Sequence, residues 1–409
     1  MIAVFIFIIL LIYSLYNKER GLIYSAVLSP ALLSISIYEI GTVFFCLSIV
    51  FLFLFKDQIK SINLGIMPFG LVIVITIFMY LISGFVAQEK HYYSLFRSLI
   101  EFSVFPLCCW IVFTKNNRFG DFVNILINAS FLIIGYTFIE TILKDNPYVH
   151  LCVAEDCFGG KFIEGVRFGF RRCQAFFSYH ETLGAYCMTN IGFYVCLLYI
   201  ENLDKFLRTK IIWVIGLLTV CVFLTGSRSS ILATVVALLP IFFAKKKYLL
   251  LVPVIFCVVY FAMPEYFSEI LSSMTNTDSV DGSNSEMRNT QLEVSFYYLM
   301  RANNIFVGNG FSFADSNVVG IDSAIAGAES IWFRIIMDQG IMGIICTAYF
   351  FIYSIYRSAK VHWLFLFFPL AYLVARTVAV VPTMTLSYII PYIMFLVLLE
   401  KYNVKLKTK

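Results

Sequence analysis

Charged residues are scarce in this chain of 409 residues. Asp, Glu, Lys and Arg together make up only 13% of it, whereas apolar and aromatic residues make up 60%. A soluble domain contains about 25% charged residues, and a single core could not bury this much Phe, Ile and Leu. The scarcity excludes a soluble globular fold and indicates an integral membrane protein.

Metal-binding motifs are also absent. The chain has four histidines and 11 cysteines, but no CxxC motif and no cluster of His and Cys. Most cysteines lie inside apolar runs, where a thiol is typical of a small core residue. Cys152 and Cys157 differ because they lie in a polar segment, where a disulfide and two free thiols are both open. We therefore expect no metal site.

A cleavable signal sequence is not recognisable. Residues 2–16 are apolar and precede Asn17-Lys18-Glu19-Arg20 without a small-residue cleavage site, so we expect them to remain as a helix. The net charge of +5 does not predict nucleic-acid binding, because the lysines occur in short clusters between apolar runs. Such clusters are typical of topology determinants in membrane proteins.

Apolar runs that could span a membrane recur along the whole chain. A spanning helix needs about 20 apolar residues, and we expect an all-α polytopic fold of about 11–13 transmembrane helices. These helices form one domain, residues 1–409, without strands. The candidate spans are residues 2–16, 22–37, 40–55, 66–87, 99–113, 122–142, 180–200, 211–225, 228–243, 248–264, 328–352, 363–381 and 384–399.

The basic residues predict the orientation of these helices. Four lysines place the C-terminal tail in the cytoplasm, and counting back helix by helix places the other Lys-rich clusters on the same side. Two polar loops, residues 143–179 and 265–327, then lie on the outer side. The larger loop has eight acidic residues and two arginines, but no lysine.

Arginine is enriched away from the cytoplasmic clusters. Twelve of the 30 basic residues lie outside those clusters, and nine of the twelve are arginine. A guanidinium binds phosphate through two N–H groups and stays charged when partly desolvated. We interpret the enrichment as an outer binding site for a phosphate or diphosphate. The alternative is that these arginines pair with the acidic residues of the loops.

Two polar segments lie at the outer ends of predicted spans. In the first, Arg172, His180 and Glu181 should gather at the membrane surface, although His180 also fits a capping or interfacial role. The second is a tight turn in which Ser227 is a candidate N-cap and Arg228 starts the next helix. A basic residue there opposes the helix dipole, so Arg228 indicates a bound anion or contact with lipid headgroups.

The large loop adds two arginines. Arg288 precedes an amphipathic run, and Arg301 follows that run. Gly308-Asn-Gly310 comes next, which is a weak phosphate-loop signal and more simply a turn that closes a surface helix.

Ionisable groups near the outer ends of the last spans are functional candidates, because charge is costly at membrane depth. Glu329 lies at the outer lip of one span, and Arg376 lies in the outer third of 363–381. Arg334 and Asp338 are four residues apart on one predicted helix, which predicts an intrahelical ion pair.

The order of these motifs resembles the O-antigen polymerase and ligase superfamily, the Wzy and WaaL type of bacterial inner-membrane glycosyltransferases. The shared pattern runs from Arg172 and His180-Glu-Thr-Leu-Gly184 through Thr225-Gly-Ser-Arg228-Ser to Gly340-Ile-Met-Gly343. It covers roughly residues 120–350. The Ser-Arg turn followed by a large outer loop is its most specific feature.

The resemblance implies a GT-C-like enzyme that acts, without a cofactor, on glycans carried by undecaprenyl diphosphate at the periplasmic face. A polymerase moves the growing glycan from its lipid carrier to the next lipid-linked unit, with a chain-length regulator as a candidate partner. Arg288 and Glu329 are then the catalytic candidates, Glu329 as the base for the acceptor hydroxyl. The residues expected to bind substrate are Arg172, His180, Glu181, Arg228, Arg288, Arg301 and Arg376; Arg172, Arg228 and Arg288 resemble clamps on the donor diphosphate.

Two departures from the family pattern matter. Ligases, which transfer finished glycan to lipid A–core, tend to have a His near the start of the span after the large loop. This chain has Ala328-Glu329-Ser330 there and no His between 181 and 361, which favours a polymerase. Many members have His-Pro-Asn where this chain has Tyr179-His180-Glu181, so the roles of His180 and Glu181 stay open. A lipid-linked oligosaccharide flippase is the second alternative, and the concentration of charges on one face counts against it.

Overall fold

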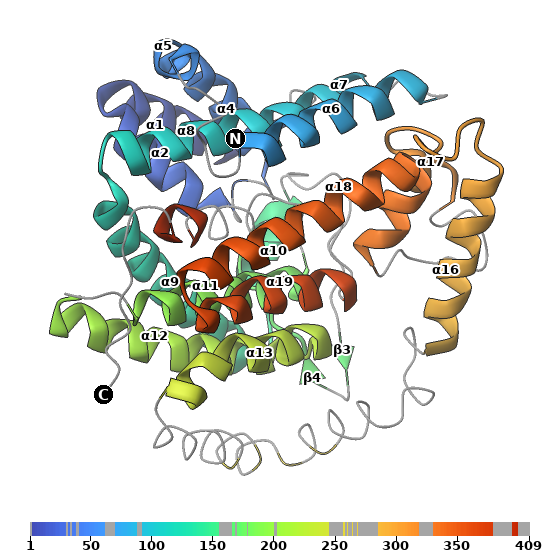
Figure 1. Cartoon of the computed structure of the whole chain (residues 1–409). Helices are drawn as coiled ribbons and strands as arrows, with labels where there is room; N and C mark the ends of the chain where they lie inside the picture. The colour runs from blue at the N-terminus through green and yellow to red at the C-terminus, as the bar shows by residue number, and fades with distance from the viewer. Residues whose placement is uncertain are drawn as a thin grey trace.

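A computed structural model describes residues 2–29, 32, 35–37, 41–61, 70–87, 92–154, 166–167, 170–177, 179–199, 203–244, 285–318, 330–378 and 395–399, with isolated residues between 257 and 268. Its helices are α1 Ile2–Tyr16, α2 Lys18–Val27, α4 Val43–Leu54, α5 Lys56–Lys60, α6 Gly70–Val86, α7 Tyr92–Leu99, α8 Phe105–Trp110, α9 Phe119–Leu143, α10 Pro147–Ala154, α11 His180–Leu197, α12 Lys205–Leu224, α13 Arg228–Ala244, α16 Ser285–Met300, α17 Phe313–Asn317, α18 Ile331–Val361 and α19 Phe367–Val378 (Figure 1).

Three shorter helical turns and two small strand pairs complete the described elements. The π-helical turns η1 Ile100–Val104 and η2 Ile111–Lys115 flank α8, and the 3₁₀ turn η5 Trp363–Leu366 precedes α19. The strand β1 Ser36–Ile37 pairs antiparallel with β2 Gly41–Thr42, and β3 Val166–Arg167 pairs antiparallel with β4 Phe170–Arg171. The expectation of no strand is therefore wrong for these four two-residue segments.

The chain is an all-α polytopic membrane protein, as its composition predicted. Among the described helices, α9, α12 and α18 are long and apolar enough to cross a membrane, and shorter apolar helices accompany them. The count of 11–13 spans remains a prediction, because the segment 248–264 and most of 384–399 lie outside the described residues.

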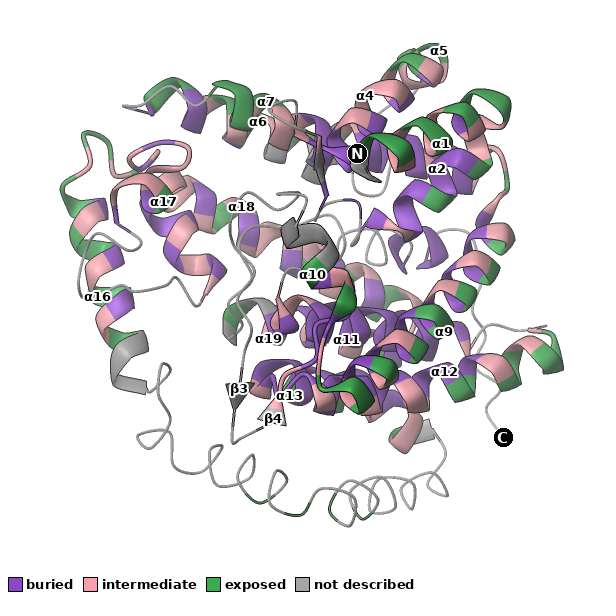
Figure 2. Ribbon diagram, turned by 180° about the vertical axis from the view of Figure 1, so that it is seen from behind, coloured by how far each residue is buried: buried purple, intermediate pink, exposed green. Residues whose placement is uncertain are grey.

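Helix α11 forms the centre of the main core. All but two of its 18 residues are buried, and it packs against α12, α13 and α19. Figure 2 shows the buried residues concentrated where these helices meet. A helix that is apolar on every side needs such neighbours on every side. One of its polar side chains is paired inside the bundle, since Tyr194 Oη and Ser130 Oγ of α9 lie 2.8 Å apart.

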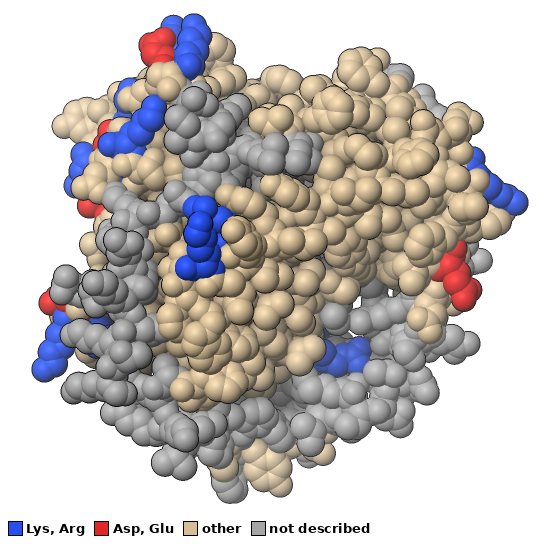
Figure 3. Space-filling model, in the orientation of Figure 1, with Lys and Arg blue, Asp and Glu red and all other residues tan. Residues whose placement is uncertain are grey.

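Helix α12 has a polar start and leads to the candidate site at its other end. Helix α12 begins at Lys205, whose first turn is capped by Asp204 through a 3.3 Å bond from Leu207 N to Asp204 Oδ2. At its other end α12 leads into the turn before α13, beside β3 and β4 (Figure 1). Figure 3 shows a broad face of uncharged side chains with the charged ones mostly toward its edges. The candidate site described below lies at the end opposite Lys205.

Two predicted spans have different bounds in the structure. The span 22–37 is not one helix, because α2 ends at Val27 and Ser36–Ile37 is a strand. Pro30 follows shortly in the sequence, and the residue before a proline disfavours the helical conformation. The predicted span 211–225 is part of a longer helix, which begins at Lys205 because the helix extends beyond the apolar region into the charged residues before it. Cys157 and the side chain of Cys152 lie outside the description, and their pairing stays open.

Candidate functional site

The turn between α12 and α13 is the framework of the site. Gly226 has φ +61°, a conformation that glycine adopts without strain. Thr225 Oγ1 donates to Val222 O at 2.7 Å and accepts from Ser227 N at 3.3 Å. Ser227 precedes α13 as predicted, and its carbonyl accepts the first helical bond, from Ile231 N at 3.0 Å. The turn is therefore fixed by its own polar groups.

Helix α11 approaches this turn closely at Gly184. A Cβ atom at Gly184 would lie 2.5 Å from Ser230 Oγ and 3.2 Å from Thr225 Oγ1. Only a residue without a side chain allows this approach. The contact brings the start of α11, with His180 and Glu181, next to the turn that starts α13 at Arg228.

Arg172 connects the first outer loop to α11 and to the turn before α13. Its Nε donates to Thr225 O at 2.8 Å, and its Nη2 donates to Gly226 O at 3.3 Å. The same Nη2 lies 3.2 Å from Glu181 Oε1, and the two side chains are only 12% and 19% exposed. Guanidinium groups fixed by several charge-assisted bonds are held in one orientation. Arg172 is thus a positioned and largely desolvated cation.

His180 and Glu181 share this cluster. His180 Nε2 lies 2.5 Å from Glu181 Oε1, the oxygen that also faces Arg172. His180 is buried rather than interfacial. It does not cap α11, because Tyr179 is the N-cap residue and its N–H donates to Thr182 Oγ1 at 3.2 Å. The gathering of Arg172, His180 and Glu181 predicted from the sequence is present, with Glu181 between the other two side chains.

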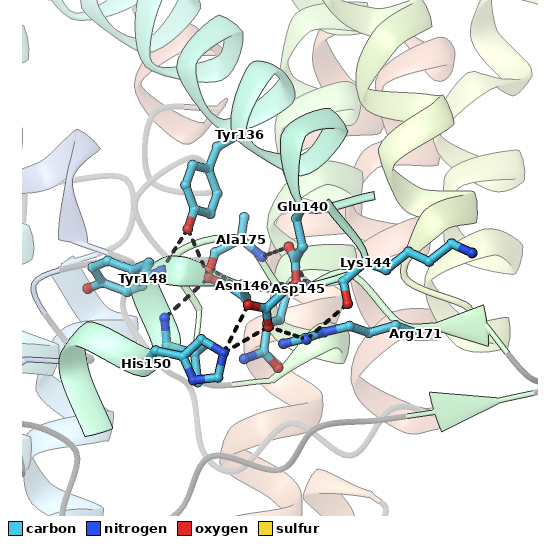
Figure 4. A network of polar contacts seen from close by, with 11 residues as sticks. Tyr136, Glu140, Lys144, Asp145, Asn146, Tyr148, His150, Arg171 and Ala175 are labelled. Atoms are coloured by element: carbon cyan, nitrogen blue, oxygen red, sulfur yellow. Dashed lines mark hydrogen bonds and ion pairs between the residues drawn. The ribbon is translucent and has the colours of Figure 1, made fainter. Parts of the chain in front are cut away.

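A second polar network holds the loop that presents Arg172 (Figure 4). Glu140, buried near the end of α9, accepts bonds from Gln174 N at 3.1 Å and from Ala175 N at 2.7 Å. Asn146 Nδ2 donates to Glu140 Oε1 at 3.1 Å and to Ala175 O at 2.8 Å. Ala175 has φ +49°, which is strained for a residue with a side chain. These bonds hold the strained turn in place.

The exposed side of the same loop carries weaker contacts. Arg171 Nη1 lies 2.8 Å from Asp145 Oδ1, and His150 Nε2 lies 2.8 Å from the same oxygen (Figure 4). The pKa of Asp145 is lowered, chiefly by the hydrogen bond from His150 and next by that from Arg171. The His150 and Asp145 side chains are 61% and 44% exposed, and ion pairs this exposed contribute little to stability.

Glu140→Gln should loosen the Arg172 loop. An amide has one acceptor oxygen and would turn N–H groups toward the buried donors of Gln174 and Ala175, and each unsatisfied buried donor costs about 1–3 kcal/mol. We expect a lower unfolding temperature in detergent and faster trypsin cleavage after Arg171 or Arg172. Asp145→Asn, which alters only the exposed contacts, is the control. Equal cleavage rates in Glu140→Gln and wild type would contradict the positioning role of Glu140.

This network was not predicted from the sequence. Glu140 was inside a predicted span, residues 122–142, and a carboxylate at membrane depth is itself a signal of a specific role. Its partners could not be predicted, because they depend on how the loop folds back onto α9.

The predicted ion pair between Arg334 and Asp338 is wrong. Arg334 Nη2 instead lies 2.8 Å from Asp315 Oδ1 of α17. Asp338 Oδ1 accepts a bond from Ala314 N at 2.8 Å. Because its carboxylate is turned to the backbone of α17, it does not pair with the guanidinium one turn earlier.

Glycines join the large loop to α18. Gly340 has φ +62° and ψ −153° and breaks the helix. The loop fills the break: Asn309 N donates to Met337 O at 2.9 Å, Gly310 N donates to Asp338 O at 3.0 Å, and Ile341 N donates to Ile305 O at 3.2 Å. The N–H groups of Asn309 and Gly310 are therefore engaged with α18, as a turn requires, rather than directed at a phosphate.

The structure gives fewer contacts for the other candidate site residues. Arg228 is the first residue of α13 and is partly exposed. Arg301 is exposed at the end of α16, with its guanidinium 3.9 Å from the ring centre of Tyr297. Arg288 lies in α16 and Arg376 in α19, but the description does not include their side chains, and Glu329 lies outside it. Within the described part of the chain, no group of three His, Cys, Asp or Glu residues could hold a metal ion.

A family model matches part of the chain. Residues 213–348 match the family model described as O-antigen ligase. The matched region begins in α12, contains the turn with Arg228 and the large loop, and ends in α18 after Gly340. It leaves out Arg172, His180 and Glu181. No curated protein sequence matches the chain significantly.

Proposed function

Because the chain belongs to the O-antigen polymerase and ligase superfamily, we propose that it is an O-antigen polymerase. It uses undecaprenyl-diphosphate-linked repeat units as both donor and acceptor. The acceptor hydroxyl oxygen attacks the anomeric carbon of the donor glycan, and a new glycosidic bond forms. The bond from that carbon to the diphosphate oxygen breaks, and the lipid diphosphate leaves with the electron pair.

The observation that supports this proposal is the fixed position of Arg172. Its guanidinium is held by Glu181 and by the carbonyl groups of Thr225 and Gly226, in the turn that begins α13 at Arg228. A leaving diphosphate gains charge in the transition state, and preorganised cations stabilise that charge. Arg172 and Arg228 lie on adjoining segments, which suits two clamps on one diphosphate.

The other roles follow from the sequence. Arg288 is the third clamp, and Glu329 takes the proton of the acceptor hydroxyl. His180 and Glu181 fix the orientation of Arg172, and Arg301 and Arg376 bind the glycan or its carrier. A chain-length regulator is the proposed protein partner.

The protein is proposed to lie in the bacterial inner membrane with its C-terminus in the cytoplasm. The basic residues at the start of α12 lie at the end of that helix opposite the site. Under the positive-inside rule, the site then faces the periplasm, where flipped lipid-linked units are available.

An O-antigen ligase is the second candidate. It is favoured by the description of the matching family model. It is disfavoured by the absence of His between residues 181 and 361 in the sequence. A flippase is less well supported, because Arg172, His180 and Glu181 cluster at one end of the bundle.

Deleting the gene in its native host distinguishes these functions on a lipopolysaccharide gel. Loss of a polymerase should leave lipid A–core carrying a single repeat unit, with no ladder above it, because units are still flipped and ligated. Naked core would contradict the polymerase and indicate the ligase or the flippase. An unchanged ladder would exclude all three functions in this pathway.

A further inference from the structure

Arg334 has an unusual environment for a buried cation. It lies near the start of α18 with its side chain only 16% exposed, and its one ion-pair partner among the described residues is Asp315, which is 43% exposed. The Nε and Nη1 atoms of Arg334 are buried and have no hydrogen-bond partner in the described part of the chain. Nearly all buried donors in native proteins are paired, so two unpaired donors on one guanidinium require an explanation.

The surroundings of Arg334 connect it to the site. The pKa of Tyr179 is raised, mainly by burial; Glu181 raises it further and Arg334 lowers it. Tyr179 is therefore within electrostatic range of both charged groups, and it directly precedes His180 in the sequence. Asp338, one turn along α18, forms no ion pair with Arg334, and its carboxylate accepts from Ala314 N.

We propose that Arg334 is a further substrate-binding residue, whose buried Nε–H and Nη1–H groups donate to phosphate oxygens of a polyprenyl diphosphate. This inference rests on the proposed function. A polymerase holds two lipid diphosphates, one on the donor and one on the acceptor. Arg172 and Arg228 serve the first of these, and Arg334 lies on a different helix, joined to the large loop through Asp315.

The chemistry of the group fits this role. Arginine stays charged when desolvated and offers several donors in one plane, which suits phosphate oxygens. Asp315 neutralises the guanidinium while the site is empty and uses only Nη2. The donors on Nε and Nη1 then remain for the phosphate oxygens of the ligand. Because burying a cation in a membrane protein costs free energy, such a residue is a candidate for a functional role.

Two substitutions break the ion pair from opposite sides and give opposite predictions. In the purified full-length protein in detergent, Arg334→Gln should weaken the binding of farnesyl diphosphate by about ten- to a hundred-fold, because charged hydrogen bonds are lost. Asp315→Asn leaves the guanidinium in place and should bind the probe at least as tightly as wild type. Farnesol, which lacks the diphosphate, should bind equally to all three proteins.

Several results would overturn the assignment. Unchanged binding in Arg334→Gln would do so, and equal weakening in both variants would mean that the pair only holds α17 against α18. If Arg334→Gln fails to fold, Asp315→Asn decides alone, since weaker binding than wild type contradicts the proposal. The lipopolysaccharide gel tests the proposed function separately. An unchanged ladder with Arg334-dependent diphosphate binding would reject the polymerase and retain this binding site.

Discussion

Replacing Arg172 by lysine should reduce polymerisation by about a hundred-fold, although the positive charge is kept. A single ammonium group cannot reproduce the bonds from Nε to Thr225 O and from Nη2 to Gly226 O and Glu181 at the same time. The cation would then no longer be fixed where the diphosphate leaves. The measurement is the lipopolysaccharide ladder of a deletion strain complemented with the variant, at matched protein level.

The neighbouring arginine provides the control. Arg171 differs from Arg172 by one position and pairs with the partly exposed Asp145. Arg171→Lys should change the ladder by less than about two-fold, because its partner Asp145 is 44% exposed and an ion pair to such a carboxylate contributes little. A normal ladder in Arg172→Lys would reject the clamp. Equal damage in both variants would mean that the loop tolerates no substitution, and it would leave Arg172 no special role.

Replacing Gly340 by alanine should destabilise the protein by about 2–4 kcal/mol. Its φ and ψ values lie in a region that is essentially restricted to glycine. A Cβ atom there would also lie 2.4 Å from Ile305 O, a backbone atom that cannot move aside. We expect little folded protein in the membrane and a clearly lower unfolding temperature in detergent for the part that folds.

Gly216 offers a matched control. It lies within α12, and a Cβ atom added to it would meet nothing within 4 Å. Gly216→Ala should be neutral or slightly stabilising, since alanine favours helix. Similar unfolding temperatures for Gly340→Ala and Gly216→Ala would show that α18 tolerates a regular helix at its break, contrary to the structure.

Much of the fold follows from residue types. The apolar runs predicted helices at α9, α11 and α13 close to their observed bounds, because spanning segments must be both helical and apolar. The gathering of Arg172, His180 and Glu181 was predictable as well. Arg172 is only eight residues before His180, where α11 begins, so the loop keeps it near the start of that helix.

Contacts that depend on loop folding could not be predicted. The spacing of Arg334 and Asp338 indicated an ion pair, and nothing local in the sequence shows that Ala314 takes the carboxylate and Asp315 takes the guanidinium. The sequence predicts a turn at Gly308-Asn-Gly310, but it does not predict that Gly308 lies against Gly340 where two backbones cross. A Cβ atom at Gly308 would lie 2.6 Å from Gly340 N, a proximity that no periodicity encodes.

The break in α18 divides the helix into two segments that pack against different elements. The segment before Gly340 packs on α16 and α17 through Phe333 and Met337, and the segment after it contacts α19 through Phe351 and Tyr372. The inserted loop is bonded to both segments, to Met337 and Asp338 before the break and to Ile341 and Met342 after it. A displacement of α16 should therefore also move the segment before Gly340, which holds Arg334. If Arg334 binds the diphosphate as proposed, a protein that binds the outer loop would adjust that binding site without entering it.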